Sequence, residues 1–396
     1  MIRNAVYFDN NATTCVAPEV RDAMLPFLNE FYANPSSIHR FGGQLAACVE
    51  KAREQMAALL GAEQPSEILF TSCGTESDSS ALLSAAATCP KRRKIVTTTV
   101  EHPAILNRVR DLARHGYRVT EIPVDGKGRL DMDFARTSID EDTLIVSVMW
   151  ANNETGNIYP VEELSEMAHS VGALFHTDAV QAVGKVPFRL SAMPGIDMLS
   201  LSGHKFHAPK GIGALYIRRG IRFHPFVLGG HQEGGRRAGT ENVASIVGMG
   251  KAAELALAGI EVENTRVRAL RDKLENAVLK SIPCVRINGD PEHRLPNTSN
   301  ISFEYIEGES ILMLLDLDNI CASSGSACTT GSLEPSHVLR AMGVPYTAAH
   351  GAIRFSFSRY NTEEEVDFTL SKLPGIIEKL RAISPYWSRR AEKNGD

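Results

Sequence analysis

Lys205 follows a hydroxyl group (Ser202), a glycine and an imidazole (His204) in the sequence. The mainly apolar residues 196–201 before this group and residues 214–217 after it predict two short strands, so Lys205 is expected at a strand-end turn. An amine that forms a Schiff base needs a partly desolvated, polar pocket that lowers its pKa. This setting can supply such a pocket, although most lysines are ordinary solvated surface charges.

A carboxylate stands upstream of this lysine. Residues 173–177 predict a buried strand, and Asp178 follows directly at its carboxyl end. Pyridoxal phosphate is a cofactor whose ring nitrogen must stay protonated, and an ion-paired carboxylate of this kind keeps it charged. An aspartate that only caps the next helix is the common alternative, but Asp178 and Lys205 together favour the cofactor.

A glycine turn between a strand and an alanine-rich helix predicts an anion site. A strand at 67–71 is followed by Gly74, Thr75 and Glu76, and the helix is expected to continue to about Ala87. Free backbone N–H groups at the positive end of the helix dipole, together with the Thr75 hydroxyl, can receive a phosphate. A hydroxyl that caps the helix and has only a structural role is the alternative.

Polar residues follow other predicted strands as well. His102 comes after a strand at 94–99 and could stack on a flat ring and exchange protons, or could simply begin a helix. Asn153 follows the apolar strand 143–150, and the polar run 9–14 follows a short strand, where it could line a site or form a simple turn. Because such clusters alternate with helices, the sequence predicts a doubly wound, mainly parallel α/β sheet with a site along its carboxyl edge.

Length and composition predict two domains. The chain has 396 residues, of which 43% are hydrophobic, and a formal net charge of −5. We assign a large domain to residues 16–258 and a smaller α+β domain to residues 1–15 and 259–396, with a charged helix at about 260–279 near the junction. The dispersed basic residues argue against nucleic acid as a partner.

The sequence also bounds the location of the protein. No run approaches the roughly 18 uninterrupted apolar residues of a membrane span, and the first residues lack an apolar targeting core. We therefore expect a cytoplasmic protein without membrane partners. The seven cysteines are odd in number and irregularly spaced, which does not fit a disulfide framework. His204 and His207 alone give only a weak metal signal, so no bound metal is expected.

Two residues in the C-terminal part could do chemistry. Cys328 is surrounded by small residues, which predicts an accessible thiol on a loop, whereas Cys321 is expected at a buried strand end. Arg354 lies in the alternating strand 352–358 and could hold a substrate carboxylate through a bidentate pair. A solvated edge arginine is the alternative at that position.

Over essentially its whole length the chain resembles the NifS-type cysteine desulfurases, which are pyridoxal phosphate enzymes of fold type I in the class V aminotransferase group. The motifs at 202–205 and 323–328 carry the resemblance most specifically, and residues 331–337 are more similar to the nitrogen-fixation branch than to the housekeeping branch. The resemblance implies L-cysteine as substrate, a homodimer, and an iron–sulfur scaffold protein as sulfur acceptor.

The resemblance also implies roles for the matching residues. Lys205 would hold the cofactor and move protons, Asp178 would pair with the pyridinium nitrogen, and His102 would stack over the ring. Arg354, with Asn153 beside it, would bind the substrate carboxylate, and Cys328 would take the sulfur as a persulfide while L-alanine leaves. Asn153 and Gln181 would contact the cofactor at the ring hydroxyl. The phosphate would be held by Gly74, Thr75, Ser202 and His204 of the same chain, and by Thr240 of the partner subunit.

Two alternatives stay open. A class V aminotransferase or a selenocysteine lyase would share the cofactor site, and the stretch around Cys328 would then be incidental or serve a different selectivity. A sulfur-relay or scaffold-binding protein with a vestigial site is the second alternative. Intact Lys205, Asp178 and Arg354 argue against it.

Overall fold

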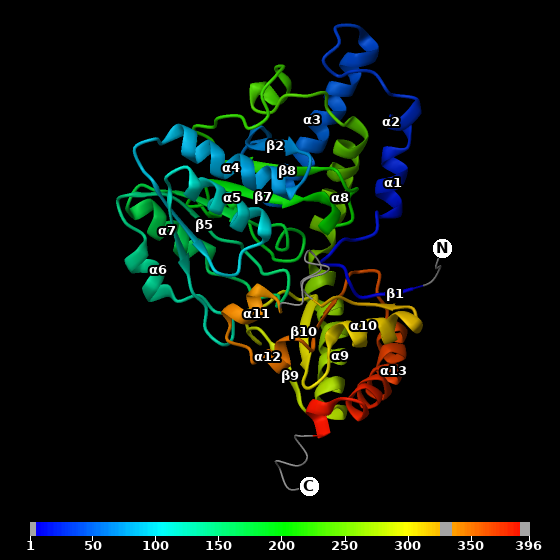
Figure 1. Cartoon of the computed structure of the whole chain (residues 1–396). Coiled ribbons are helices and arrows are strands. Elements are labelled where there is room, and N and C mark those ends of the chain that lie inside the picture. The colour runs from blue at the N-terminus through cyan, green and yellow to red at the C-terminus, as the bar shows by residue number, and fades with distance from the viewer. Residues whose placement is uncertain (1–4, 325–334, 389–396) are drawn as a thin grey trace.

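The computed structural model describes residues 5–324 and 335–388 (Figure 1). Its largest sheet contains seven strands: β2 (Ile68–Thr71), β3 (Lys94–Thr98), β4 (Arg118–Ile122), β5 (Thr143–Ser147), β6 (Leu174–Asp178), β7 (Met198–Ser202) and β8 (Gly213–Ile217). Their order is β2-β8-β7-β6-β5-β3-β4. β8 runs antiparallel to β2 and β7, and the other neighbours are parallel. The predicted mainly parallel α/β sheet is confirmed.

Helices cover both faces of this sheet. They are α1 (Pro18–Met24), α2 (Pro26–Asn29), α3 (Arg40–Leu60), α4 (Gly74–Thr88), α5 (Pro103–Arg114), α6 (Met132–Ser138), α7 (Val161–Ser170) and α8 (Val243–Val262), with short helical turns η1 (Pro65–Glu67), η2 (Leu190–Ala192), η3 (Gly203–Lys205) and η4 (Gln232–Gly235). Successive residues of β2 pack into different cores on the two faces of the sheet. Leu69 packs in the cluster that contains the buried residues of α4 and α5, whereas Ile68 and Phe70 pack with those of α3 and α8.

The C-terminal part forms a second core with the N-terminal strand (Figure 1). Its elements are β1 (Val6–Tyr7), α9 (Arg268–Ser281), β9 (Val285–Asn288), β10 (Thr298–Phe303), α10 (Gly308–Leu317), β11 (Ile320–Cys321), β12 (Ala352–Ser356) and α13 (Glu363–Ala382). β12, β10 and β9 form an antiparallel sheet, and β1 pairs in parallel with β11. Phe8, Leu274 and Phe355 are fully buried in this second core.

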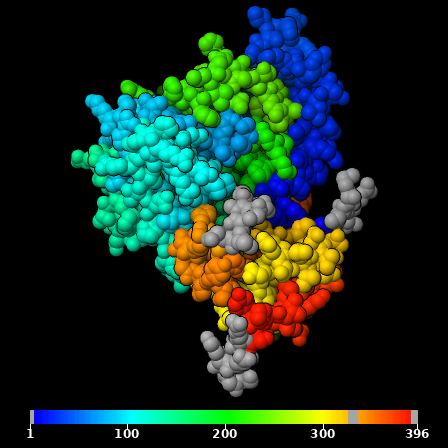
Figure 2. All heavy atoms as spheres, in the orientation of Figure 1, coloured from blue at the N-terminus to red at the C-terminus, as the bar shows by residue number. Residues whose placement is uncertain are grey.

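The two parts are joined by packing as well as by the chain. Val338 of α11 (His337–Ala341) and Ala348 of α12 (Tyr346–Ala349) belong to the larger core. In the space-filling view the orange segment, which contains α11 and α12, lies directly against the cyan segment of the large part (Figure 2). The domain boundaries at residues 15/16 and 258/259 stay a prediction.

The helix at the junction is longer than predicted. α8 continues through a π-helical turn, η5 (Glu263–Val267), directly into α9, so the helix expected at 260–279 is the second half of a helical run over 243–281. Within the described part of the chain, this run alone is long and apolar enough to cross a membrane. However, 56% of its most apolar window is buried inside the protein, as in the core helix of a globular domain.

Candidate active site

A cavity of about 270 Å³ opens at the carboxyl edge of the large sheet. The residues predicted from separate strand ends meet here: Gly74, Thr75, His102, Asn153, Asp178, Gln181, Ser202, His204, Lys205 and Arg354. Thr240 lines a different cavity, together with Ser72 and Arg237. Cys328 lies outside the described residues. Residues 5–324 and 335–388 contain no cluster of three or more potential metal ligands.

The start of α4 offers backbone N–H groups to the cavity. A Cβ atom at position 74 would lie 2.9 Å from Val180 Cγ2 and 3.4 Å from Ser202 Cβ, so glycine allows the helix to begin close to β7. The N-cap is Cys73, which makes no side-chain capping hydrogen bond, so the hydroxyl cap considered from the sequence is not observed. The first N–H groups of a helix have no intrahelical acceptor, and an anion can satisfy them.

Lys205 closes η3 directly after β7. Its Nζ donates to the carbonyl oxygens of Asn11 at 2.6 Å and Ala12 at 2.9 Å, and both of these residues line the cavity. The polar run 9–14 therefore contributes to the site. In the sequence this run could be recognised as turn-forming polar residues after a short strand. That pattern does not predict which residues the turn contacts.

Asp178 ends β6 and is almost fully buried, and its Oδ1 accepts from the Val180 N–H at 2.9 Å. Burial raises its pKa, against the lowering effect of His102, the Val180 N–H and Lys205. Two more acids are buried nearby. Burial raises the pKa of Glu101 to about 8, and burial and the charge of Asp178 raise the pKa of Asp78. A carboxylate in such a place needs a cation, and a protonated ring nitrogen can supply it.

His102 is the N-cap of α5, where its Nδ1 accepts from the Ala104 N–H at 3.1 Å. It also lines the cavity, so the two interpretations of this residue are compatible. Burial lowers the pKa of His102, and Lys205 and His337 lower it further, whereas Asp178 raises it. A neutral imidazole at the N-terminus of α5 can pack against a flat ring without adding a charge to the cavity.

Unpartnered polar atoms test whether the cavity fits the cofactor. Ser202 Oγ and Gln181 Oε1 are buried and lack hydrogen-bond partners within the described chain, although both residues line the cavity. His204 places Nδ1 3.1 Å from Thr13 Oγ1, and burial, followed by the charge of Lys205, lowers its pKa to about 4. The cavity therefore offers the Ser202 hydroxyl, the Gln181 amide and the neutral His204 imidazole. Together with the N-terminus of α4 and the Asp178 carboxylate, these groups match the polar groups of pyridoxal phosphate.

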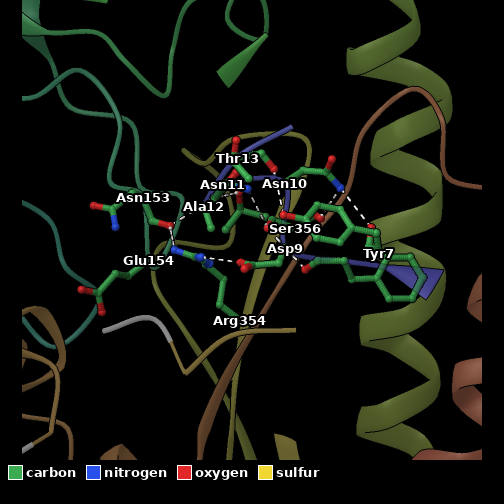
Figure 3. Close-up of polar contacts among 12 residues, drawn as sticks. Tyr7, Asp9, Asn10, Asn11, Ala12, Thr13, Asn153, Glu154, Arg354 and Ser356 are labelled. Carbon is green, nitrogen blue, oxygen red and sulfur yellow. Dashed lines mark hydrogen bonds and ion pairs between the residues drawn. The ribbon is translucent and has the colours of Figure 1, made fainter. Parts of the chain in front are cut away.

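Arg354 is buried on β12, with only 2% of its side chain exposed. Its Nη2 donates to Asp9 Oδ1 at 2.7 Å and its Nη1 donates to the Asn153 carbonyl at 3.0 Å (Figure 3). The alternative of a solvated edge arginine is therefore wrong. Cys321 ends β11 as a half-buried residue rather than a buried one, and burial raises the pKa of its thiol.

Comparisons with known proteins identify the family of the chain. The family model described as "Aminotransferase class-V" matches residues 6–368. The "Cysteine desulfurase NifS" of Azotobacter vinelandii is 60% identical over 383 residues, which cover 97% of this chain and 95% of that protein. The "Cysteine desulfurase" of Gluconacetobacter diazotrophicus is 61% identical over 389 residues, covering 98% and 97% of the two chains.

A solved structure described as "NIFS-LIKE PROTEIN" superposes with a TM-score of 0.89 at 42% identity, covering 95% of this chain and all of that one. The chain belongs to the class-V aminotransferase family and, within it, to the NifS-type cysteine desulfurases. The expected fold type I architecture and pyridoxal phosphate as cofactor are confirmed.

Proposed function

We propose that the chain converts L-cysteine to L-alanine and places the sulfur on Cys328 as a persulfide. The observation that carries this proposal is the convergence of the Lys205 amine, the Asp178 carboxylate and the Arg354 guanidinium in one cavity. These groups supply a covalent anchor, a counter-ion for a ring nitrogen and a binding group for an amino-acid carboxylate. Relatives named cysteine desulfurases over nearly the whole length support the same reaction.

Three side chains and one helix turn of the cavity would have defined tasks in this reaction. Pyridoxal phosphate, when bound, supplies an electron sink that weakens the bonds at the substrate's α-carbon. Asp178 would keep the ring nitrogen protonated, and the first turn of α4 would hold the phosphate. Arg354 would hold the cysteine carboxylate. Lys205 would remove the proton from the substrate Cα and later donate a proton to another carbon atom of the reacting molecule.

Sulfur transfer needs a thiolate, which we assign to Cys328. Its sulfur attacks the sulfur of the substrate, so an S–S bond forms while the Cβ–S bond breaks. The electron pair of the broken bond stays with Cβ, and a proton added there completes L-alanine. One thiol and one cysteine thus become one persulfide and one alanine, and no external oxidant is required.

The remaining assignments concern the assembly. Thr240 lies outside the cavity of its own chain, which supports a homodimer in which Thr240 of the partner subunit reaches the phosphate. The family resemblance favours an iron–sulfur scaffold protein as sulfur acceptor, in the cytoplasm, and the similarity to NifS favours a role in nitrogen fixation. If the chain were an aminotransferase or a selenocysteine lyase, the Cys328 thiol would not accept sulfur from cysteine.

Replacing Cys328 tests the proposal. Cys328→Ala should still bind the cofactor and change its absorbance when cysteine is added, because substrate binding depends on Lys205, Asp178 and Arg354. Release of alanine and sulfide should fall at least ~100-fold, because the nucleophile is gone. Cys321→Ala is the matched control and should keep the wild-type rate. Wild-type rates in Cys328→Ala would favour a reaction in which this thiol is a bystander.

A further inference from the structure

The guanidinium of Arg354 already carries one carboxylate. Its Nη2 donates to Asp9 Oδ1 and its Nη1 donates to the Asn153 carbonyl (Figure 3). A guanidinium has five N–H groups, so three remain after these two bonds. One of them is on Nε, which is buried and lacks a hydrogen-bond partner among the described residues. Because Arg354 also lines the cavity, it can donate to a second carboxylate without releasing the first.

Asp9 is fixed by its own backbone. It forms a parallel β-bridge with Ser356, and its carbonyl accepts from the Ala12 N–H at 3.0 Å. Its side chain is 20% exposed, whereas that of Arg354 is 2% exposed. Because the backbone holds Asp9 at this place, its negative charge stays beside Arg354 when a substrate arrives.

We propose that Asp9 sets the affinity of the carboxylate subsite. It is a resident anion that weakens the binding of amino-acid carboxylates to Arg354 and thereby favours release of the alanine product. The proposal rests on the proposed function, since it takes Arg354 as the group that binds the carboxylates of cysteine and alanine.

The charges explain the direction of the effect. With Asp9 ionised, the pair Asp9–Arg354 is neutral, and a bound amino acid adds a second carboxylate to the same cation. Two carboxylates on one guanidinium repel each other, which in this largely buried site changes the affinity roughly tenfold. Asp9 also orients the guanidinium, so its removal has two opposing effects. Asp9→Asn separates them, because asparagine keeps the acceptor oxygen and loses the charge.

The test measures the dissociation constants of L-alanine and L-alaninamide by titrating the holoenzyme and following the cofactor absorbance. The two ligands share the amine and the methyl group, but the amide has no negative charge. In Asp9→Asn the dissociation constant of L-alanine should fall roughly tenfold, whereas that of L-alaninamide should stay unchanged. Product inhibition by alanine should strengthen in parallel.

Asp367→Asn is the matched control. Asp367 contacts Lys273 Nζ at the same distance of 2.7 Å, but on the outer face of α9 and α13. This variant should leave both dissociation constants unchanged. If Asp9→Asn folds poorly, Asp9→Ala gives a second measurement, because the Asn153 carbonyl still holds Nη1 and the ratio of the alanine to the alaninamide constant should again fall.

An unchanged or higher ratio in a folded Asp9 variant would overturn the proposal, as would an equal change for both ligands. Failure of the proposed function gives a different result. In that case neither the wild-type enzyme nor the Asp9 variants would release alanine from cysteine.

Discussion

At the scale of single residues, the account depends first on Lys205. Among the described residues that line the cavity, no other lysine is present. We expect Lys205→Ala to remain folded but to lower alanine release from cysteine at least ~1000-fold, because the described lining of the cavity then contains no lysine amine to anchor the cofactor and move the α-proton. Alanine release is measured by chromatography, with circular dichroism as the test of folding.

Lys210→Ala is the control for this variant, since Lys210 is exposed and close in sequence. It should retain wild-type turnover. Normal turnover in Lys205→Ala would remove the basis for assigning the cofactor to this lysine.

The residue types at strand ends could be predicted from the sequence, but their pairing could not. Asp178 and His102 were recognised because the carboxyl ends of parallel strands meet at one edge of a sheet. The pair Asp9–Arg354 joins residues that are 345 positions apart. Arg354 lies in β12, whereas Asp9 lies in the turn segment after β1, and neither local pattern specifies a partner. The buried acids Asp78 and Glu101 looked like ordinary polar residues of a helix and a turn.

At the scale of elements, the first turn of α4 gives a prediction about packing. A side chain at Gly74 would press on Val180 and Ser202, and overpacking of this kind costs about 1–3 kcal/mol. Gly74→Ala should therefore weaken cofactor binding roughly tenfold or more, because the helix start must shift away from β7. Equilibrium dialysis of the cofactor measures the change.

Gly43→Ala is the matched substitution, because a Cβ atom at Gly43 in α3 meets nothing within 4 Å. It should leave cofactor affinity unchanged and stabilise the helix by up to about 1 kcal/mol. An equal loss of affinity in both variants would show that the contacts around Gly74 are not the cause.

The interior of β6 gives a prediction about pH. His176 is fully buried, with Nδ1 2.9 Å from Ser147 Oγ and Nε2 2.9 Å from Ser200 Oγ. Burial lowers its pKa from 6.5 to about 3. Between these values the unfolded chain binds a proton that the folded chain does not, so the free energy of unfolding falls as the pH drops below about 6.5.

Urea unfolding at pH 7.5 and 5.5 measures this contribution. His176→Gln should reduce the loss of stability between the two pH values by about 1 kcal/mol relative to wild type. The other titrating groups are common to both proteins, so the difference isolates His176. His115→Gln, at a site with 69% side-chain exposure, should behave as wild type. A loss in His176→Gln as large as in wild type would contradict the assigned cause.

Element positions were predictable where local patterns specify them. Apolar runs followed by turn residues gave the strands of the large sheet, and α4 begins at Gly74 as the glycine turn predicted. The length of the run from α8 to α9 was not predictable, because a π-helical turn continues the helix through a charged stretch that resembles a boundary. The antiparallel direction of β8 depends on packing with β2 and β7, which no local pattern records.

At the scale of the whole molecule, the cavity lies where the two cores meet. Arg354 comes from the antiparallel sheet of the C-terminal part, Asp178 ends β6 of the large sheet, and Lys205 lies in η3 directly after β7. The backbone of Arg354 also exchanges hydrogen bonds with Ser323, its N–H donating at 2.6 Å and its carbonyl accepting at 3.2 Å. Ser323 stands shortly before Cys328 in the sequence. β12, which carries the proposed carboxylate-binding arginine, is thus hydrogen-bonded to the segment that precedes the proposed nucleophile.

The most direct test of the central claim follows the sulfur atom. The wild-type holoenzyme is treated briefly with L-cysteine without reductant, digested, and the masses of its cysteine peptides are measured. The account predicts one additional sulfur on the peptide that contains Cys328, and loss of that mass when a thiol is added, because a persulfide is readily reduced. Additional sulfur only on another cysteine, or alanine formed with no sulfur on Cys328 at any time, would contradict it.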